Sequence, residues 1–193
     1  VEDKNGERID TTQRPFKVYV EGEEFRADAL IICTGAEAIW LDAENEEAHK
    51  GRGISTCATC DGAFFRDHEI MVVGGGDSAM EEATFLTRFA TKVTIVHRRE
   101  FFRASKVMLE RAKQHPKIEI KTFRSVKAWL ADDSGLTGAV LEDPRDDSTE
   151  ELAITGAVIA IGHTPITAFL DGQLETDQDG YILHKEFTMT SVE

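Results

Sequence analysis

Short apolar runs alternate with amphipathic stretches through the middle of the chain. Residues 70–73, 93–96 and 118–123 are compact, largely apolar runs, and each is typical of a buried strand. Residues 77–90 and 104–114, which separate these runs, place apolar side chains at helical spacing. The order strand, helix, strand, helix, strand predicts an α/β fold with a parallel sheet.

The pattern changes after residue 123. Residues 126–130, 138–141 and 152–154 are three short apolar runs separated by acidic, turn-forming stretches, which predicts an antiparallel β-meander. Residues 157–161 then return to a buried strand. We therefore expect the meander to be an insert before the last strand of the α/β domain.

The first fifty residues carry a weaker pattern. Residues 17–20 are expected to form a strand. Residues 29–34 are expected to form a second, buried strand, in which Cys33 is a small apolar side chain. The mixed, acidic residues 37–53 predict a linker or a surface loop.

Composition limits the possible partners and location. The 193 residues suffice for one domain, or for one domain and part of another. A net charge of −14 argues against a nucleic-acid partner, because phosphate backbones bind basic surfaces. No apolar stretch is long enough to span a membrane and no signal segment opens the sequence, so we expect a cytoplasmic protein with no membrane partner. The chain starts at Val1 and stops at Glu193 without a tail, so we expect a fragment of a longer protein.

A glycine-rich turn follows the first of the three apolar runs and opens the helix after it. It consists of Gly74, Gly75, Gly76, Asp77, Ser78 and Ala79, which fit Gly-x-Gly-x-x-[Gly/Ala]. In a Rossmann-like dinucleotide-binding domain, the first glycine of this motif, here Gly74, permits a tight turn, and the second, here Gly76, lets the backbone approach a pyrophosphate. The small residue at its end, here Ala79, lets the helix pack closely on the sheet. The alternative is a glycine-rich turn without a ligand, because the motif alone is a weak signal.

Basic residues follow the next strand, where the ribose of a dinucleotide would lie. An NAD site places an acidic residue about twenty positions after the glycines, whereas this chain has His97, Arg98 and Arg99, with Arg103 shortly after. Guanidinium groups bind phosphate bidentately, so the sequence favours NADPH over NADH. Two alternatives stay open, namely a solvated basic helix start and an NAD ribose bound by Glu100.

Two of the three cysteines form a Cys-x-x-Cys pair. Cys57 and Cys60 are close enough in sequence to close a small disulfide ring, and a helix start would stabilise a thiolate there. Asp61 places a carboxyl group beside them, where it could move a proton during oxidation or reduction. The alternatives are half of a zinc site, which lacks a second ligand pair, and two inert buried thiols. We therefore expect no metal.

Together these motifs resemble the low-molecular-weight thioredoxin reductases of bacteria, fungi and plants. The resemblance rests on Cys57-Ala-Thr-Cys-Asp-Gly62, the glycine-rich turn, His97-Arg-Arg99 with Arg103, Ala160-Ile-Gly-His-Thr-Pro165 and Thr34-Gly35-Ala36. It implies a flavoprotein fold with two dinucleotide-binding domains, here an NADPH domain with a β-meander insert flanked by partial FAD-domain segments. On this basis residues 1–44 and 171–193 belong to the FAD domain, and residues 45–170 to the NADPH domain.

The resemblance also implies a reaction. Electrons would pass from NADPH through FAD to the Cys57/Cys60 disulfide and then to thioredoxin, in a homodimer. Cys60 would face the flavin, Cys57 would attack thioredoxin, and Asp61 would act as acid and base. The implied cofactor contacts are Gly74, Gly75, Gly76, Asp77, Ser78, Ala79, His97, Arg98, Arg99, Arg103, Ile161 and Gly162, with Thr34 and Gly35 at the exit of the flavin domain.

One feature of the family is missing from the sequence. Its FAD fingerprint, a first Gly-x-Gly-x-x-Gly near the N-terminus, is absent, so FAD is expected of the intact protein. In this family the NADPH domain rotates, which implies hinges near residues 37–46 and 170–176. The alternative functions are the reductase component of an alkyl-hydroperoxide system and an isolated NADP(H)-binding module that does not turn over.

Overall fold

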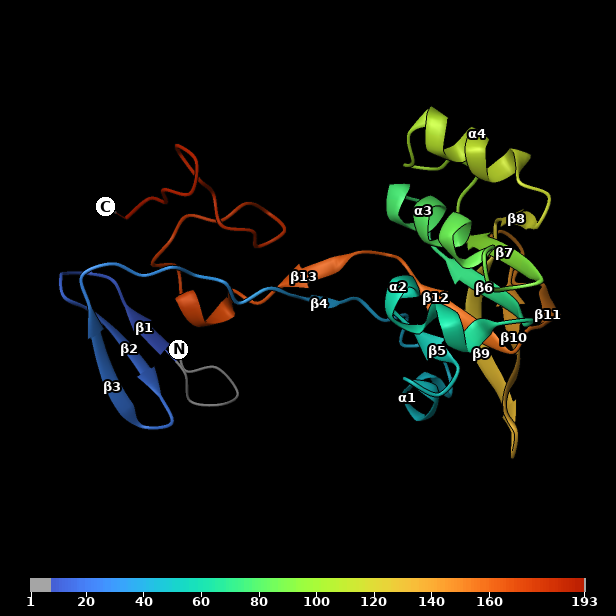
Figure 1. The fold of residues 1–193 in the computed structure, drawn as a ribbon, viewed down its shortest axis with the longest axis horizontal. Helices are drawn as coiled ribbons and strands as arrows, with labels where there is room; N and C mark the ends of the chain where they lie inside the picture. Colours follow the sequence, from blue (N-terminus) through green and yellow to red (C-terminus); the bar gives the residue numbers. More distant parts are fainter. Residues whose placement is uncertain (1–7, 193) are drawn as a thin grey trace. The chain divides into compact units, whose positions relative to one another are not determined.

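The chain folds into two compact units, and it passes from one unit to the other twice. The computed structural model describes residues 8–192. Residues up to Ala38 and from His163 onward form the flanking unit, and Ile39–Gly162 forms the central unit. Figure 1 shows both units and the two connections between them. Within the described residues, no helix is long and apolar enough to cross a membrane.

A parallel sheet forms the middle of the central unit. Its strands are β5 (Ile54–Ser55), β6 (Glu69–Val73), β7 (Lys92–His97), β8 (Ile118–Thr122) and β12 (Gly156–Ile159), in the order β5-β12-β6-β7-β8. The helix α3 (Asp77–Leu86) connects β6 to β7, and α4 (Lys106–Gln114) connects β7 to β8. This arrangement confirms the predicted α/β, Rossmann-like fold.

Different layers cover the two faces of this sheet. On β6, Ile70 and Val72 pack in one apolar cluster with α3 and α4, whereas Met71 and Val73 pack in a second cluster with the meander. Burial on both faces explains why these strands are continuous apolar runs in the sequence. The meander consists of β9 (Ser125–Asp132), β10 (Gly135–Glu142) and β11 (Thr149–Ala153), and its antiparallel pairing is as predicted.

The flanking unit is built from short antiparallel pairs. Its strands are β1 (Arg8–Asp10), β2 (Phe16–Val20) and β3 (Glu23–Ala27) in one sheet, and β4 (Ala36–Ala38) paired with β13 (His163–Pro165) in another, followed by the 3-10 helix η2 (Ala168–Leu170). The strand predicted at residues 17–20 is confirmed as β2. The buried strand predicted at residues 29–34 is wrong, because Ile31 is 90% exposed and Cys33 is exposed as well. A buried strand needs neighbours, and no described segment pairs with these residues.

The segment 37–53 is more ordered than the predicted surface loop. It contains the short helix α1 (Glu46–His49), and Glu46 is only 2% exposed. The Glu46 carboxylate accepts hydrogen bonds from two backbone N–H groups of the preceding turn, at 3.1 Å each, and from Nε1 of Trp129 at 3.3 Å. Glu46 therefore anchors this segment to the meander, which the local sequence pattern did not indicate.

Candidate functional site

The glycine-rich turn lies at the carboxyl end of β6 and leads into α3. A Cβ atom on Gly74 would overlap the carbonyl oxygen of Ala160 and the Cβ of Ala79. A Cβ atom on Gly76 would meet nothing within 4 Å. Gly76 is also the N-cap of α3, and no side chain of the described residues 8–192 caps that helix. Packing therefore requires glycine at the first position, whereas the third position leaves an open face at a helix N-terminus, which suits an anion.

A loop carrying three arginines lies against this turn. We refer to residues 98–105 as the arginine loop. The backbone N–H groups of Arg103 and Ala104 both donate to the carbonyl oxygen of Gly75, at 2.8 and 3.0 Å. A Cβ atom on Gly75 would also overlap the ring of His97, at the end of β7. The turn and the loop are therefore in direct contact.

The charges on the arginine loop are unpaired. Arg98, Arg99 and Arg103 are exposed, and among residues 8–192 their guanidinium groups have no hydrogen-bond or ion-pair partner. Arg124 differs, because its guanidinium binds Glu150 at 2.6 Å and Asp143 at 2.8 Å. Three unpaired guanidinium groups on one loop can bind a phosphate group, whereas Arg124 is already engaged within the protein.

The ring of His97 contacts two residues of the arginine loop. It stacks on Phe102, with ring centroids 4.6 Å apart, and its Nε2 lies 3.1 Å from the carbonyl oxygen of Phe101. Burial lowers the pKa of His97, and the positive charges of the arginine loop lower it further, against the opposing effect of the Phe101 hydrogen bond. A neutral ring that donates from Nε2 satisfies this arrangement, so His97 serves as a structural donor near neutral pH.

A hollow of about 720 Å³ opens between the glycine-rich turn, the arginine loop and the start of the meander. We refer to it as the nucleotide hollow. The predicted contact residues that line it are Gly74, Gly75, Gly76, Ser78, His97, Arg98, Arg103, Ile161 and Gly162. Asp77, Ala79 and Arg99 are not among its lining residues.

Nine residues that line the nucleotide hollow were not among the predicted contacts. Three of them, Val73, Val96 and Ala160, are neighbours of predicted contacts in the chain. The other six are Ile39, Trp40, Leu41, Arg124, Ser125 and Val126. No motif marks these six, because they come from the start of the central unit and from the residues at the start of β9. Only the folded sheet places these two segments beside the glycine-rich turn.

The carboxylate of Asp77 is turned toward the arginine loop. Its Oδ1 accepts a hydrogen bond from the backbone N–H of Ser105 at 2.7 Å. Ser105 is in turn the N-cap of α4, where its hydroxyl accepts from the N–H of Met108 at 3.4 Å. Asp77 therefore connects the first residue of α3 to the end of the arginine loop.

Cys57 and Cys60 form a disulfide, with their Cα atoms 5.3 Å apart, as predicted from their spacing. Cys57 is the N-cap of α2 (Ala58–Asp61), and its Sγ accepts from the N–H of Cys60 at 3.2 Å. The single turn of α2 leads directly into the 3-10 helix η1 (Gly62–Phe65). A thiolate at Cys57 would therefore be stabilised by this backbone donor and by the Thr59 hydroxyl, which lies 3.5 Å from the sulfur, rather than by the dipole of a long helix.

Ser55 connects the disulfide segment to the acidic residue beside it. Ser55 ends β5 and is 6% exposed. Its hydroxyl donates to Oδ2 of Asp61 at 2.6 Å and accepts from the N–H of Cys57 at 3.0 Å. Sequence analysis did not identify Ser55, since a serine two residues before a cysteine pair carries no distinctive signal. The structure makes it the residue that orients the Asp61 carboxylate.

Thr34 and Gly35 belong to the flanking unit and are not among the residues that line the nucleotide hollow. The Thr34 hydroxyl donates to the carbonyl oxygen of Ile166 at 2.6 Å, and the Gly35 carbonyl accepts from the N–H of Ile166 at 3.0 Å. Gly35 has a φ of +73°, a conformation that favours glycine. Their expected role at a flavin site stays a prediction.

Glu82 on α3 has a half-buried carboxyl group. Its Oε2 is buried and has no hydrogen-bond partner among residues 8–192. Burial raises the pKa of Glu82 to about 7, and the neighbouring charge of Glu81 adds to this increase. Glu82 lies one helical turn before Phe85, whose ring packs on Gly62 at the start of η1. This carboxyl group therefore lies on the side of α3 that faces the segment after the disulfide.

The comparisons with known proteins agree with this geometry. A family model described as pyridine nucleotide-disulphide oxidoreductase matches residues 1–193. The chain belongs to this family. Membership implies nicotinamide and flavin cofactors, and it fits a disulfide that shares one compact unit with the nucleotide hollow.

Several relatives and solved structures carry the name thioredoxin reductase. The chain is 50% identical over 179 residues to the enzyme of Mycolicibacterium smegmatis, covering 91% of this chain and 57% of the relative. It is 45% identical over 191 residues to that of Rickettsia felis, covering 97% of this chain and 62% of the relative. The thioredoxin reductase structure from Giardia duodenalis is 43% identical with a TM-score of 0.83, covering 96% of this chain and 62% of that one. The chain thus spans about three fifths of the length of these relatives.

Proposed function

We propose that this chain is the nucleotide-binding and disulfide-carrying part of an NADPH-dependent thioredoxin reductase that also uses FAD. The observation that carries this proposal is the pairing of two features in the central unit. One is the Cys57–Cys60 disulfide beside Asp61, and the other is a nucleotide hollow flanked by unpaired guanidinium groups. The relatives that match the chain are named for the same reaction.

The residues that line the nucleotide hollow fit a bound dinucleotide. The open face of Gly76 and the uncapped start of α3 suit a pyrophosphate. Arg98 and Arg103, which line the hollow, suit a 2′-phosphate, with Arg99 exposed beside them. When bound, the nicotinamide nucleotide and the flavin supply the two electrons that the disulfide receives.

The chemistry of the chain itself takes place at the two sulfur atoms. Two electrons break the Cys57–Cys60 bond and, with two protons, leave two thiols. The Cys57 thiolate attacks one sulfur of the thioredoxin disulfide, which forms a mixed disulfide and releases the other thioredoxin sulfur as a thiolate. Cys60 then attacks the Cys57 sulfur, re-forms the internal disulfide and releases reduced thioredoxin. Asp61, oriented by Ser55, supplies and accepts the proton at these sulfur atoms.

Cysteine variants of the full-length protein test this assignment. Cys57→Ser and Cys60→Ser should each abolish NADPH-dependent thioredoxin reduction, because neither can form the internal disulfide. Reduction of the flavin by NADPH should persist in both variants. It is measured as a decrease in the visible absorbance of the flavin. Cys33→Ser is the matched control, since Cys33 is an exposed free cysteine outside the pair. Thioredoxin reduction at the wild-type rate in either pair variant would refute the proposal.

A further inference from the structure

We propose that Asp77 is a positioning residue that gives the nucleotide hollow its selectivity for a 2′-phosphate. It would do so by fastening the arginine loop to the glycine-rich turn. The inference rests on the proposed function, since it assumes that the arginine loop binds the 2′-phosphate of NADPH. Asp77 itself is not among the residues that line the nucleotide hollow.

Three backbone groups of the arginine loop are held by the turn. Arg103 and Ala104 donate to the carbonyl oxygen of Gly75, and Ser105 donates to the Asp77 carboxylate at 2.7 Å. Of these three hydrogen bonds, the one to Asp77 has a side-chain acceptor, and it binds the last residue of the loop. A bidentate guanidinium–phosphate contact requires a defined direction of approach, so the backbone that carries the guanidinium groups must be held still.

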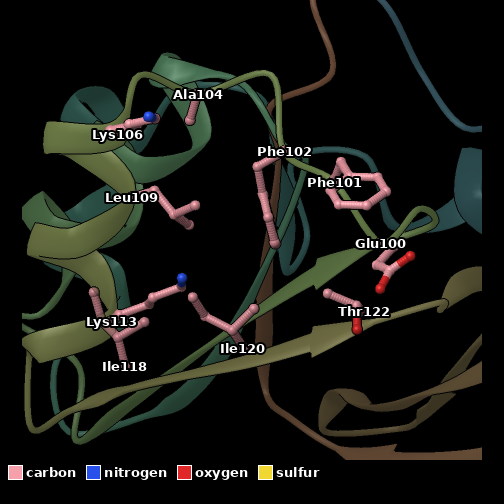
Figure 2. Close-up of a pocket in the computed structure, with 10 residues that line it drawn as sticks. All are labelled: Glu100, Phe101, Phe102, Ala104, Lys106, Leu109, Lys113, Ile118, Ile120 and Thr122. Carbon is pink, nitrogen blue, oxygen red and sulfur yellow. The ribbon is translucent and has the colours of Figure 1, made fainter.

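Packing on the other side of the arginine loop is incomplete. Figure 2 shows Phe102 and Ala104 among the side chains that line a second hollow, together with Leu109 and Ile120, and the first two are partly buried side chains that pack against the core of the central unit. The volume of this hollow is about 530 Å³. Phe101 is 79% exposed. Because this hollow leaves the apolar packing of the loop incomplete, the hydrogen bonds with the turn, together with the contacts of His97 with Phe101 and Phe102, carry a larger share of its positioning.

The charge of Asp77 supports a positioning role. A carboxylate beside a phosphate site repels the ligand, so by itself it would weaken nucleotide binding. An ionised acceptor forms a stronger hydrogen bond with an N–H group than a neutral one does. The hydrogen bond from Ser105 therefore stabilises the loop through the negative charge of Asp77, and this stabilisation offsets the repulsion of the ligand. The first turn of α3 also favours an acidic residue.

The test compares two probes that differ only in the 2′-phosphate. In the full-length protein, calorimetric titrations measure the affinities for 2′,5′-ADP and 5′-AMP, and their ratio reports 2′-phosphate selectivity. Asp77→Ala should reduce this ratio by about five- to tenfold relative to Asp77→Asn. The asparagine variant removes the same charge but keeps an Oδ1 acceptor for Ser105, so it controls for the change in electrostatic repulsion. Equal ratios in the two variants would overturn the inference.

A second pair of variants removes the donor instead of the acceptor. Ser105 has a φ of −59°, which proline adopts. Ser105→Pro removes the N–H group that Asp77 binds and should reduce the ratio as Asp77→Ala does. Ser105→Ala loses the cap of α4 but keeps that N–H group, so it should retain the ratio. If the proline and alanine variants behave alike, the inference fails even where Asp77→Ala does not fold.

Arg98→Ala separates this inference from the proposed function. Arg98 lines the nucleotide hollow, so its loss should weaken 2′,5′-ADP binding tenfold or more and leave 5′-AMP binding nearly unchanged. If Arg98→Ala does not change the ratio, the 2′-phosphate assignment itself is wrong. If it lowers the ratio while the Asp77 and Ser105 variants do not, the assignment stands and the positioning role of Asp77 is refuted.

Discussion

Replacing the first and third glycines of the turn separately should distinguish packing from ligand binding. Gly76 has φ −97° and ψ 179°, which any residue adopts, and an added Cβ atom meets nothing within 4 Å. Gly76→Ala should therefore change the free energy of unfolding by less than about 1 kcal/mol, including the poorer N-cap preference of alanine. An added methyl group would nevertheless hold a pyrophosphate away from the first N–H groups of α3. The loss of such charge-assisted hydrogen bonds corresponds to about 1.5–3 kcal/mol, or roughly ten- to hundredfold in affinity.

The opposite result is expected at the first position. A Cβ atom on Gly74 would overlap the backbone oxygen of Ala160, which cannot move without distorting β12 and its continuation. Overpacking of this kind costs about 1–3 kcal/mol or more, so Gly74→Ala should lower the melting temperature by several degrees.

Both variants are assayed in the full-length protein by thermal melting and by titration with NADP⁺, which binds without transferring electrons. A Gly76→Ala protein that melts within about 4 °C of wild type and binds NADP⁺ tenfold more weakly supports the reasoning. Wild-type affinity in Gly76→Ala would show that the pyrophosphate does not approach this face. Wild-type stability in Gly74→Ala would show that the turn is not packed as described.

Two further predictions concern acidic side chains of the central unit. Folded Glu82 binds its proton more tightly than the unfolded chain does, with a pKa of about 7 against 4.5, so wild-type stability falls as pH rises between these values. Glu82→Gln lacks this loss, so its advantage in the free energy of unfolding should grow over this pH range, by on the order of 1 kcal/mol because the group is only partly buried. Thermal melts of both proteins across this range measure the difference, and a constant difference would refute the argument. Ser55→Ala removes the 2.6 Å donor to Asp61 and should slow thioredoxin reduction about tenfold and shift its pH profile, whereas Ser55→Thr keeps the hydroxyl group. Identical pH profiles for wild type and Ser55→Ala would exclude an orienting role for Ser55.

The sequence alone predicted most of the central unit, because local patterns are sufficient there. Strands buried on both faces are continuous apolar runs, so β6, β7 and β8 were predicted within one or two residues of their bounds. The glycine-rich turn and the cysteine pair were identified for the same reason, since their chemistry depends on residues adjacent in the chain. The disulfide between Cys57 and Cys60 confirms one of these predictions directly.

Only the tertiary structure decided which distant residues meet. A periodic pattern reports that a side chain is buried or exposed, but it does not identify the neighbour. The buried strand predicted around Cys33 was wrong because burial depends on partners that no described segment provides. The contacts of Glu46 with Trp129, of Ser55 with Asp61 and of Asp77 with Ser105 join separate elements of the fold. Each is a hydrogen bond between groups on different elements of the fold, so no local pattern in the sequence marks it.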